Sequence, residues 1–187
     1  MKLAIFDLDG TLSPQRPYST APFQRTLLPA VSARLSALKQ QGVLLAVATN
    51  QGGANRQRSE RLSFGAVQAH LCWLRHELGL HAARFATIAA RKKPNPNMLI
   101  ELMNQFNVVP DETLFVGNAE TDRQAAIAAH IPFVHAELFF HDGEVFNVYR
   151  QDRFSTFRAD CQSCPTSPAT LPGRISCAGT PNYFRLD

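Results

Sequence analysis

Short apolar runs alternate along the chain with segments whose apolar residues recur every three or four positions. The first run, residues 3–6, has no polar alternation, which is typical of a strand buried on both faces of a parallel sheet. Each later run predicts a strand of the same kind. These runs cover residues 43–48, 85–89, 113–116 and 131–134.

Helices are predicted between the strands, because the apolar residues there follow helical spacing. The first helix should end at Gly42, a glycine C-cap. A helix that begins at Asn95 and Pro96 has a capping residue followed by proline at the first position, and Thr121 with Gln124 predicts a capping box for the last helix. The inward positions are Val31, Leu35 and Leu38; Val67, Leu71, Leu74 and Leu78 within residues 62–78; and Met98, Leu99, Leu102, Met103 and Phe106.

This alternation of strands and helices predicts an α/β fold. The expected architecture is a three-layer, doubly wound parallel sheet with helices on both faces, a Rossmann-like arrangement. Residues 138–140 and 145–148 predict an additional hairpin at the sheet edge, because a turn sequence, His141-Asp142-Gly143, lies between them.

The regular pattern is lost near Arg153, where prolines begin to alternate with Ser, Thr and Gly. We therefore expect one domain over residues 1–150 and an irregular tail over residues 151–187. The tail carries Cys161, Cys164 and Cys177. Three thiols are one ligand short of a structural zinc site, so we expect reduced, unpaired cysteines, with zinc binding as the alternative.

The composition agrees with a globular protein: 187 residues, 45% hydrophobic and 18% charged, are enough for a sizeable core. The formal net charge of +4 suits an anionic partner, but no basic run reaches the length of a nucleic-acid-binding arm. The first apolar run meets Asp7 after four residues, so it is no signal peptide, and no apolar segment is long enough to span a membrane. We expect a cytoplasmic protein without a membrane partner.

Two carboxylates follow the first strand directly. Asp7 and Asp9 are two positions apart in extended backbone, so their side chains share a face. Like charges this close destabilise each other unless a cation lies between them. Gly10 turns the chain away after the pair, which places both acids at the mouth of the sheet. The alternative is two surface acids in an ordinary turn.

Polar residues also follow other strands, and in an open parallel sheet these strand ends lie along one edge, where ligands bind. The side chains offer oxygen ligands for a cation, hydrogen-bonding groups and one ammonium, a set that suits Mg²⁺ together with a phosphate. The residues collected at this edge are Asp7, Asp9, Thr49, Asn50, Lys93, Asn118 and Asp122.

These residues form four ordered motifs, each after a strand, over Met1 to about His135. The motifs resemble those of phosphatases of the haloacid dehalogenase (HAD) superfamily. Within it the chain is similar to subfamily IIIA, which includes histidinol-phosphate, heptose bisphosphate and polynucleotide 3′-phosphatases. The motifs are Asp7-x-Asp9-Gly10-Thr11, Thr49-Asn50-Gln51-Gly52, Arg91-Lys92-Lys93-Pro94 and Gly117-Asn118-x-x-x-Asp122.

The resemblance implies a role for each acid. Asp7 would be the nucleophile that forms an aspartyl phosphate. Asp9 would protonate the leaving oxygen and later activate water, with its backbone carbonyl on the metal. The implied Mg²⁺ ligands are Asp7, Asp9, Asn118 and Asp122.

The resemblance also implies the groups that hold the substrate. Thr49 and Lys93 would bind the phosphoryl oxygens, and Lys93 would offset the charge of the neighbouring carboxylates. Asn50 is a further candidate for binding phosphate. Lys92 is a candidate for contacting the substrate, with a solvated lysine as the alternative.

One position departs from the family pattern. Most relatives have a metal-binding Asp where this chain has Asn118. An amide oxygen can still coordinate Mg²⁺, but one negative charge is lost, so we predict weakened metal binding. Glu120 or Asp122 could compensate, although Glu120 also suits an exposed residue near a helix start.

The spacing of the motifs leaves no room for an inserted cap domain, and the zinc-binding Cys/His loop of some relatives is missing. Cys72 stands alone in that region, and we expect it in the core. The resulting prediction is a capless, Mg²⁺-dependent phosphomonoesterase that acts through an aspartyl phosphate on a small phosphorylated metabolite such as a sugar phosphate. The alternatives are a polynucleotide 3′-phosphatase, whose partner is a nucleic-acid end, and a non-catalytic protein that binds a phosphorylated ligand.

Overall fold

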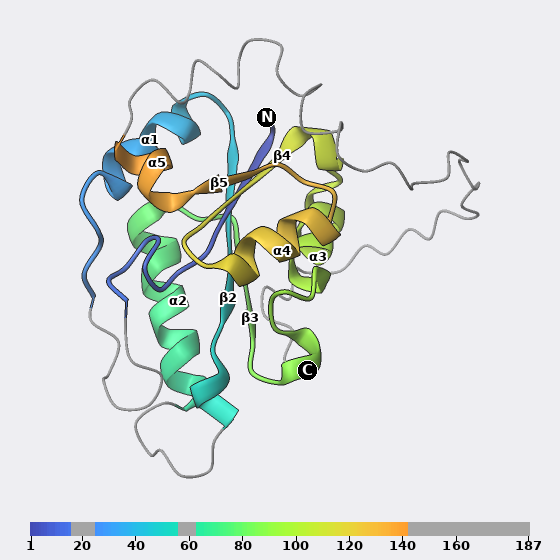
Figure 1. Cartoon of the computed structure of the whole chain (residues 1–187). Coiled ribbons are helices and arrows are strands. Elements are labelled where there is room, and N and C mark those ends of the chain that lie inside the picture. Colours follow the sequence, from blue (N-terminus) through green and yellow to red (C-terminus); the bar gives the residue numbers. More distant parts are fainter. Residues whose placement is uncertain (16–24, 56–62, 142–187) are drawn as a thin grey trace, which may run out of the picture.

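The computed structural model describes residues 1–15, 25–55 and 63–141 (Figure 1). One parallel five-stranded sheet crosses the molecule in the order β3-β2-β1-β4-β5. The strands are β1 (Leu3–Phe6), β2 (Leu44–Asn50), β3 (Ala82–Ala86), β4 (Thr113–Gly117) and β5 (Phe133–His135). β1 is therefore the central strand, with all four residues buried.

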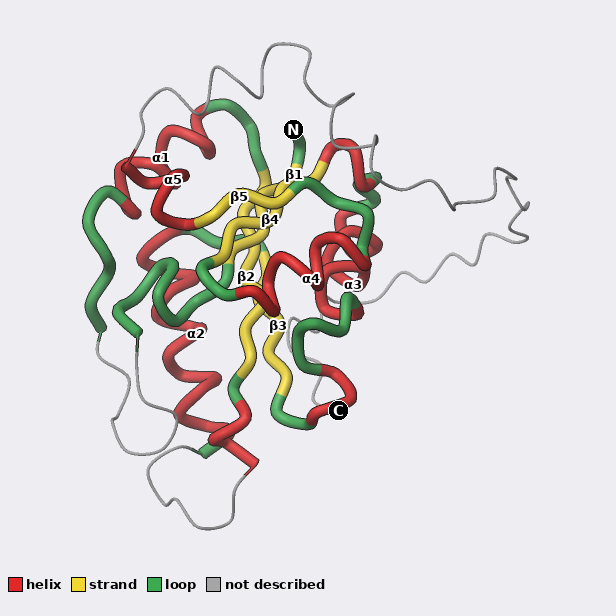
Figure 2. Tube along the Cα trace, viewed as in Figure 1, coloured by secondary structure: helices red, strands yellow, loops and turns green. Residues whose placement is uncertain are grey.

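Helices cover both faces of the sheet (Figure 2). The helices α1 (Val31–Gln40), α2 (Phe64–Leu78) and α5 (Ala136–His141) pack on one face with Ala4 and Phe6. The helices α3 (Asn97–Phe106) and α4 (Glu120–Ala128) pack on the other face with Leu3 and Ile5. Because alternate residues of a strand point to opposite faces, β1 contributes to both cores. The predicted three-layer α/β fold is confirmed.

Two strands begin two or more residues away from the predicted position. β3 begins at Ala82 rather than residue 85, and the segment after it forms a short 3₁₀-helix (Ala89–Arg91). Arg84 lies within β3 and obscured the apolar pattern, but β3 is an edge strand, and the Arg84 guanidinium donates a hydrogen bond to Gln105 on α3. β5 likewise begins two residues later than predicted.

The predicted hairpin is wrong in its first half, because Leu138–Phe140 belong to α5. Residues 145–148 lie outside the described residues. One helical turn buries Ala136 and Phe139 on the same side and leaves Leu138 exposed. The Phe139 and Phe140 rings lie 5.7 and 6.4 Å from the ring of Phe6. Adjacent apolar residues fit a short helix as well as a strand, and packing against β1 selects the helix.

Cys72 is exposed, so the prediction that it lies in the core is wrong. The buried face of α2 carries Val67, His70, Leu71, Leu74 and Leu78. Cys72 follows Leu71 by one residue and is therefore turned about 100° away from that face.

The tail (151–187), with its three cysteines, lies outside the described residues, and so does the domain end at residue 150. Within the described ranges, no helix combines the length and the apolar composition needed to cross a bilayer.

Candidate active site

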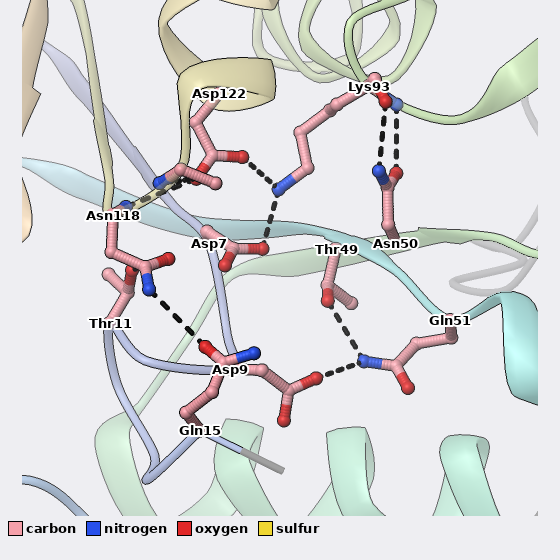
Figure 3. Close-up of polar contacts among 11 residues, drawn as sticks. Asp7, Asp9, Thr11, Gln15, Thr49, Asn50, Gln51, Lys93, Asn118 and Asp122 are labelled. Carbon is pink, nitrogen blue, oxygen red and sulfur yellow. Dashed lines mark hydrogen bonds and ion pairs between the residues drawn. The ribbon is translucent and has the colours of Figure 1, made fainter. Parts of the chain in front are cut away.

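The side chains predicted to converge do meet at the carboxyl edge of the sheet (Figure 3). Asp7 directly follows β1, and its N–H still donates to the carbonyl of Val116 at 2.9 Å. Thr49 and Asn50 are the last residues of β2. Lys93 arrives from the segment before α3, and Asp122 lies in the first turn of α4. Four chain segments thus place their polar groups in one region.

Lys93 bridges two carboxylates at the centre of the site. Its ammonium lies 2.5 Å from Oδ1 of Asp7 and 2.7 Å from Oδ1 of Asp122. The side chains of Lys93 and Asp122 are 2% and 1% exposed, and that of Asp7 is 10% exposed. The face of the Phe115 ring lies 5.4 Å below the ammonium. The bridge is shielded from solvent, so its charges interact strongly.

Two carboxylates share one ammonium, which leaves an excess negative charge in a buried place. Burial therefore raises the pKa of Asp7 to about 6; the Lys93 ammonium opposes this shift, and the charge of Asp122 adds to it. For Lys93, burial disfavours the charged form, but the two carboxylates outweigh it and raise the lysine pKa above its ordinary value. Lys93 is consequently a permanent cation at neutral pH.

Asp122 also closes the start of α4. Its Oδ2 accepts hydrogen bonds from the backbone N–H groups of Asn118, at 3.1 Å, and Ala119, at 3.0 Å. The predicted capping box of Thr121 and Gln124 is therefore wrong: the helix begins at Glu120, and the carboxylate of Asp122 satisfies the N–H groups before it. The metal-binding role of Asp122 stays a prediction, while both of its oxygens are engaged by protein donors.

Asn118 lies between two polar side chains of the segment that follows β1. Its Nδ2 donates to Oε1 of Gln15 at 3.3 Å, and its Oδ1 accepts a long, 3.5 Å hydrogen bond from the Thr11 hydroxyl. Gly10 has a φ of +83°, and a Cβ at this position would collide with the Asn118 amide. The side chain of Asn118 thus packs tightly against the Asp9-Gly10-Thr11 turn, although its role as a metal ligand stays a prediction.

Asn50 holds the backbone of Lys93. Its Oδ1 accepts the Lys93 N–H at 2.8 Å, and its Nδ2 donates to the Lys93 carbonyl at 3.0 Å. These two bonds fix the position from which the Lys93 side chain enters the site. The predicted binding of phosphate by Asn50 is not tested by this contact.

Lys92 and Glu120 lie outside this cluster. Lys92 is half-buried, and within the described part of the chain its ammonium makes no hydrogen bond or ion pair with protein groups. Its contact with substrate stays a prediction. Glu120 is exposed and pairs with Arg123 at 2.6 Å, and hydrogen bonds from Arg123 and Gln124 lower the pKa of this carboxyl. Glu120 is thus paired with its own helix, and its compensation for the missing acid stays a prediction.

Gln51 is a polar residue of the site that the sequence analysis did not select. It is 3% exposed, and its Nε2 donates to Oδ2 of Asp9 at 2.8 Å and to the Thr49 hydroxyl at 3.0 Å. The sequence could have indicated Gln51, because it lies two residues after Thr49 and residues two apart in a strand point to the same face.

The donor set fits a hard divalent cation. The described residues contain no cluster of three or more His, Cys, Asp or Glu side chains arranged for a metal. Mg²⁺ does not need one, because it is usually held by one or two carboxylates, waters and substrate phosphate. The carboxylate of Asp7, the carbonyl of Asp9 and the amide oxygen of Asn118 supply only oxygen donors, the type that Mg²⁺ prefers.

Comparison with known families identifies the domain. The family model described as polynucleotide kinase 3 phosphatase matches residues 2–140. The chain belongs to the polynucleotide kinase 3 phosphatase family. It is a HAD-type phosphatase of the subfamily IIIA kind, as the motifs indicated. Membership in this family favours an enzyme over a non-catalytic binding protein.

Curated relatives of this family member are bacterial phosphatases. It is 28% identical over 152 residues to D-glycero-beta-D-manno-heptose-1,7-bisphosphate 7-phosphatase of Mesorhizobium japonicum, an alignment that covers 74% of this chain and 68% of that protein. The enzyme of the same name from Escherichia coli K12 is 26% identical over 144 residues, which cover 68% and 75% of the two chains.

Solved structures show the same fold. The D,D-heptose 1.7-bisphosphate phosphatase of B. bronchiseptica, complexed with magnesium and phosphate, superposes with a TM-score of 0.60 at 23% identity, covering 71% of this chain and 79% of that one. A putative HAD-like phosphatase of Mesorhizobium loti gives 0.57 at 25% identity, with 70% and 69% covered. The Rossmann-like HAD fold is thereby confirmed.

Proposed function

We propose that this HAD-type phosphatase is a Mg²⁺-dependent phosphomonoesterase that hydrolyses a small phosphorylated metabolite, such as a sugar phosphate, through an aspartyl phosphate. The observation that carries the proposal is the buried bridge in which Lys93 holds Asp7 and Asp122 at the carboxyl edge of the sheet. An ammonium beside a carboxylate nucleophile lets that nucleophile approach a phosphate that it would otherwise repel.

In the first step Asp7 acts as the nucleophile. One of its carboxylate oxygens forms a bond to phosphorus, and the bond from phosphorus to the ester oxygen breaks. The electron pair of that bond stays with the leaving oxygen, which takes a proton from Asp9 and departs as an alcohol. The product of this step is the phosphorylated Asp7 side chain.

In the second step the deprotonated Asp9 takes a proton from water. The water oxygen attacks phosphorus, and the bond to the Asp7 oxygen breaks. This restores the carboxylate of Asp7, releases inorganic phosphate and returns the proton to Asp9. The free enzyme is thereby regenerated.

Lys93 and Thr49 hold the phosphoryl group during both steps. The Lys93 ammonium and the Thr49 hydroxyl are donors that the fold fixes before substrate arrives, so they need no reorganisation as charge develops on the phosphoryl oxygens. Asn50 fixes the Lys93 backbone through two hydrogen bonds and is also a candidate to bind phosphate. Lys92, half-buried beside Lys93, is the candidate to contact the rest of the substrate.

Asp7, the Asp9 carbonyl and Asn118 would hold Mg²⁺, with Asp122 as a further candidate. When bound, the ion neutralises negative charge on the phosphoryl group and on Asp7.

The substrate class follows from two considerations. The relatives named above act on a heptose bisphosphate, which favours a sugar phosphate for this chain. The description of the matching family favours a second candidate, a 3′-phosphorylated polynucleotide end. The described residues between the motif segments hold no inserted domain, so the site suits either substrate.

A phosphatase screen with Mg²⁺ tests the proposal. The panel contains sugar phosphates, amino-alcohol phosphates and 3′-phosphorylated oligonucleotides, and the matched control is Asp7→Asn, which keeps the side-chain volume. We expect turnover of a sugar phosphate by the natural protein and loss of at least about a thousandfold in the variant. Turnover of oligonucleotides alone would select the second candidate, and equal inactivity of both proteins across the panel would overturn the proposed function.

A further inference from the structure

The side chain of Gln51 contacts two residues of the proposed reaction, Asp9 and Thr49. We infer that Gln51 is a positioning residue, which orients the Asp9 carboxylate for proton transfer and the Thr49 hydroxyl for binding of the phosphoryl group. The inference rests on the proposed function, in which Asp9 and Thr49 serve these roles.

The backbone fixes Gln51 at the end of β2. Its N–H donates to the carbonyl of Ala86, the last residue of β3, at 2.8 Å, and its carbonyl accepts the N–H of Ala54 at 3.1 Å. Gln51 is buried, with only 3% of the residue exposed. It extends along the carboxyl edge toward Asp9 on the neighbouring segment (Figure 3). Gln51 is therefore anchored at both backbone groups before its side chain enters the site.

The Gln51 amide presents its nitrogen to both partners. Nε2 donates to Oδ2 of Asp9 at 2.8 Å, an oxygen that can accept this bond while Oδ1 carries the proton. The same nitrogen lies 3.0 Å from the Thr49 oxygen. The nitrogen has two hydrogens, and these two contacts use both.

The contact with Thr49 has a directional consequence. A hydroxyl has one hydrogen and two lone pairs. Because the Thr49 oxygen accepts from Gln51, its own hydrogen points away from Gln51 and is available to donate to a phosphoryl oxygen. Without Gln51 the hydroxyl could rotate and present a lone pair to the phosphate instead, which would be repulsive.

The contact with Asp9 selects one of the two carboxylate oxygens. Oδ2 accepts the Gln51 N–H, so the proton that Asp9 delivers to the leaving oxygen is carried by Oδ1. The Gln51 hydrogen bond favours one rotation of the carboxylate about its terminal bond over the others. Asp9 must lie within hydrogen-bond distance of the leaving oxygen to protonate it. Loss of the Gln51 hydrogen bond should therefore slow the departure of a leaving group that needs this proton.

The dependence on the leaving group tests the inference. An aryl phosphate with a nitrophenolate leaving group departs without a proton, whereas an alkyl phosphate needs one from Asp9. We compare kcat/KM, which reports the first irreversible step, for both substrates in the natural protein and in Gln51→Leu. Gln51→Met is the second variant, which keeps a side chain of similar length but removes the amide donors without adding a charge beside Asp9. Gln40→Leu, at the exposed end of α1, is the matched control.

We expect Gln51→Leu to lower kcat/KM for the alkyl phosphate by about a hundredfold and for the aryl phosphate by about tenfold or less. Gln51→Met should show the same difference between the substrates, and Gln40→Leu should match the natural protein. Equal losses on both substrates in both variants would overturn the inference, because a merely structural role lowers both alike. Inactivity of the natural protein on both substrates would instead count against the proposed function.

Discussion

The ammonium of Lys93 lies 2.5 Å from a carboxylate oxygen of Asp7, although 86 residues separate them along the chain. The same ammonium lies 2.7 Å from Asp122. Lys93 thus pairs with two buried carboxylates in the folded protein, and in the proposed function it also binds the phosphoryl group of the substrate. The proposal therefore makes stability and activity depend on the same cation.

Replacement of Lys93 by methionine should destabilise the fold strongly. The variant would leave Asp7 and Asp122 buried without a counter-ion, and removal of one partner from a buried pair costs about 3–5 kcal/mol. Urea unfolding monitored by circular dichroism measures the change. The matched control is Lys2→Met, which removes an exposed ion pair with Glu112 and should cost about 1 kcal/mol or less. Similar losses in both variants would show that the Lys93 bridge contributes no more than a surface pair.

The raised pKa of Asp7 predicts how stability changes with pH in protein freed of divalent ions. The folded state holds the Asp7 proton up to about pH 6, whereas the unfolded chain releases it near pH 3.8. The folded state therefore binds more protons between these values, and Asp7's contribution to stability is fully present below pH 3.8 and is lost as the pH rises through about 6. A shift of about two units corresponds to about 3 kcal/mol.

The difference between the natural protein and Asp7→Asn isolates this contribution, because the other titrating groups are common to both. The free energy of unfolding, measured in urea with chelator present from pH 4 to 8, should fall with rising pH more steeply in the natural protein than in the variant. Parallel curves would contradict the assigned pKa shift.

The strand ends could be predicted from the sequence because of a simple physical rule. An apolar run that stops at Asp7, Thr49 or Asn118 predicts a buried strand and also the polar residue at its carboxyl end. Parallel strands bring these polar residues together at one edge of the sheet. The sequence could not show that Asn50 holds the backbone of Lys93, or that Asp122 caps its own helix. Those contacts depend on side-chain directions that only tertiary packing determines.

The errors have a physical cause as well. Leu138–Phe140 and Cys72 were misjudged because apolar character was taken as the guide, while burial depends on which side of a helix faces the sheet. Gln51 was missed because its role depends on two hydrogen bonds, to Asp9 and to Thr49, that the sequence does not show.

Asn118→Asp should strengthen the binding of Mg²⁺. The substitution adds a carboxylate where the amide now contacts Thr11 and Gln15, and affinity for divalent cations rises with the charge of the ligands. We expect a decrease in the dissociation constant on the order of tenfold by isothermal titration with Mg²⁺ alone. The control is Asn97→Asp, an exposed position at the start of α3 that should leave the affinity unchanged. An unchanged affinity in Asn118→Asp would mean that position 118 is not a ligand.

Gly117→Ala should destabilise the protein through Asp122. A Cβ at Gly117 would lie 2.5 Å from Oδ2 and 2.7 Å from Cβ of Asp122, distances that real Cβ atoms do not adopt. Asp122 cannot yield without lengthening its bonds to Lys93 and to the N–H groups before α4. We expect a loss of about 1–3 kcal/mol in the free energy of unfolding, as for other overpacked sites, and reduced phosphatase activity.

Gly65→Ala provides the control for this substitution. Gly65 lies in the first turn of α2, where an added Cβ would make only an ordinary 3.7 Å contact with Ser63. Alanine is the better helix former by about 1 kcal/mol, so this variant should be as stable as the natural protein or more so. Equal stability of Gly117→Ala would show that Asp122 can move to make room for the added Cβ. In that case the ion pair of Asp122 with Lys93 is not rigid, and it does not fix the position of Asp7. Urea unfolding of the two variants side by side decides this point.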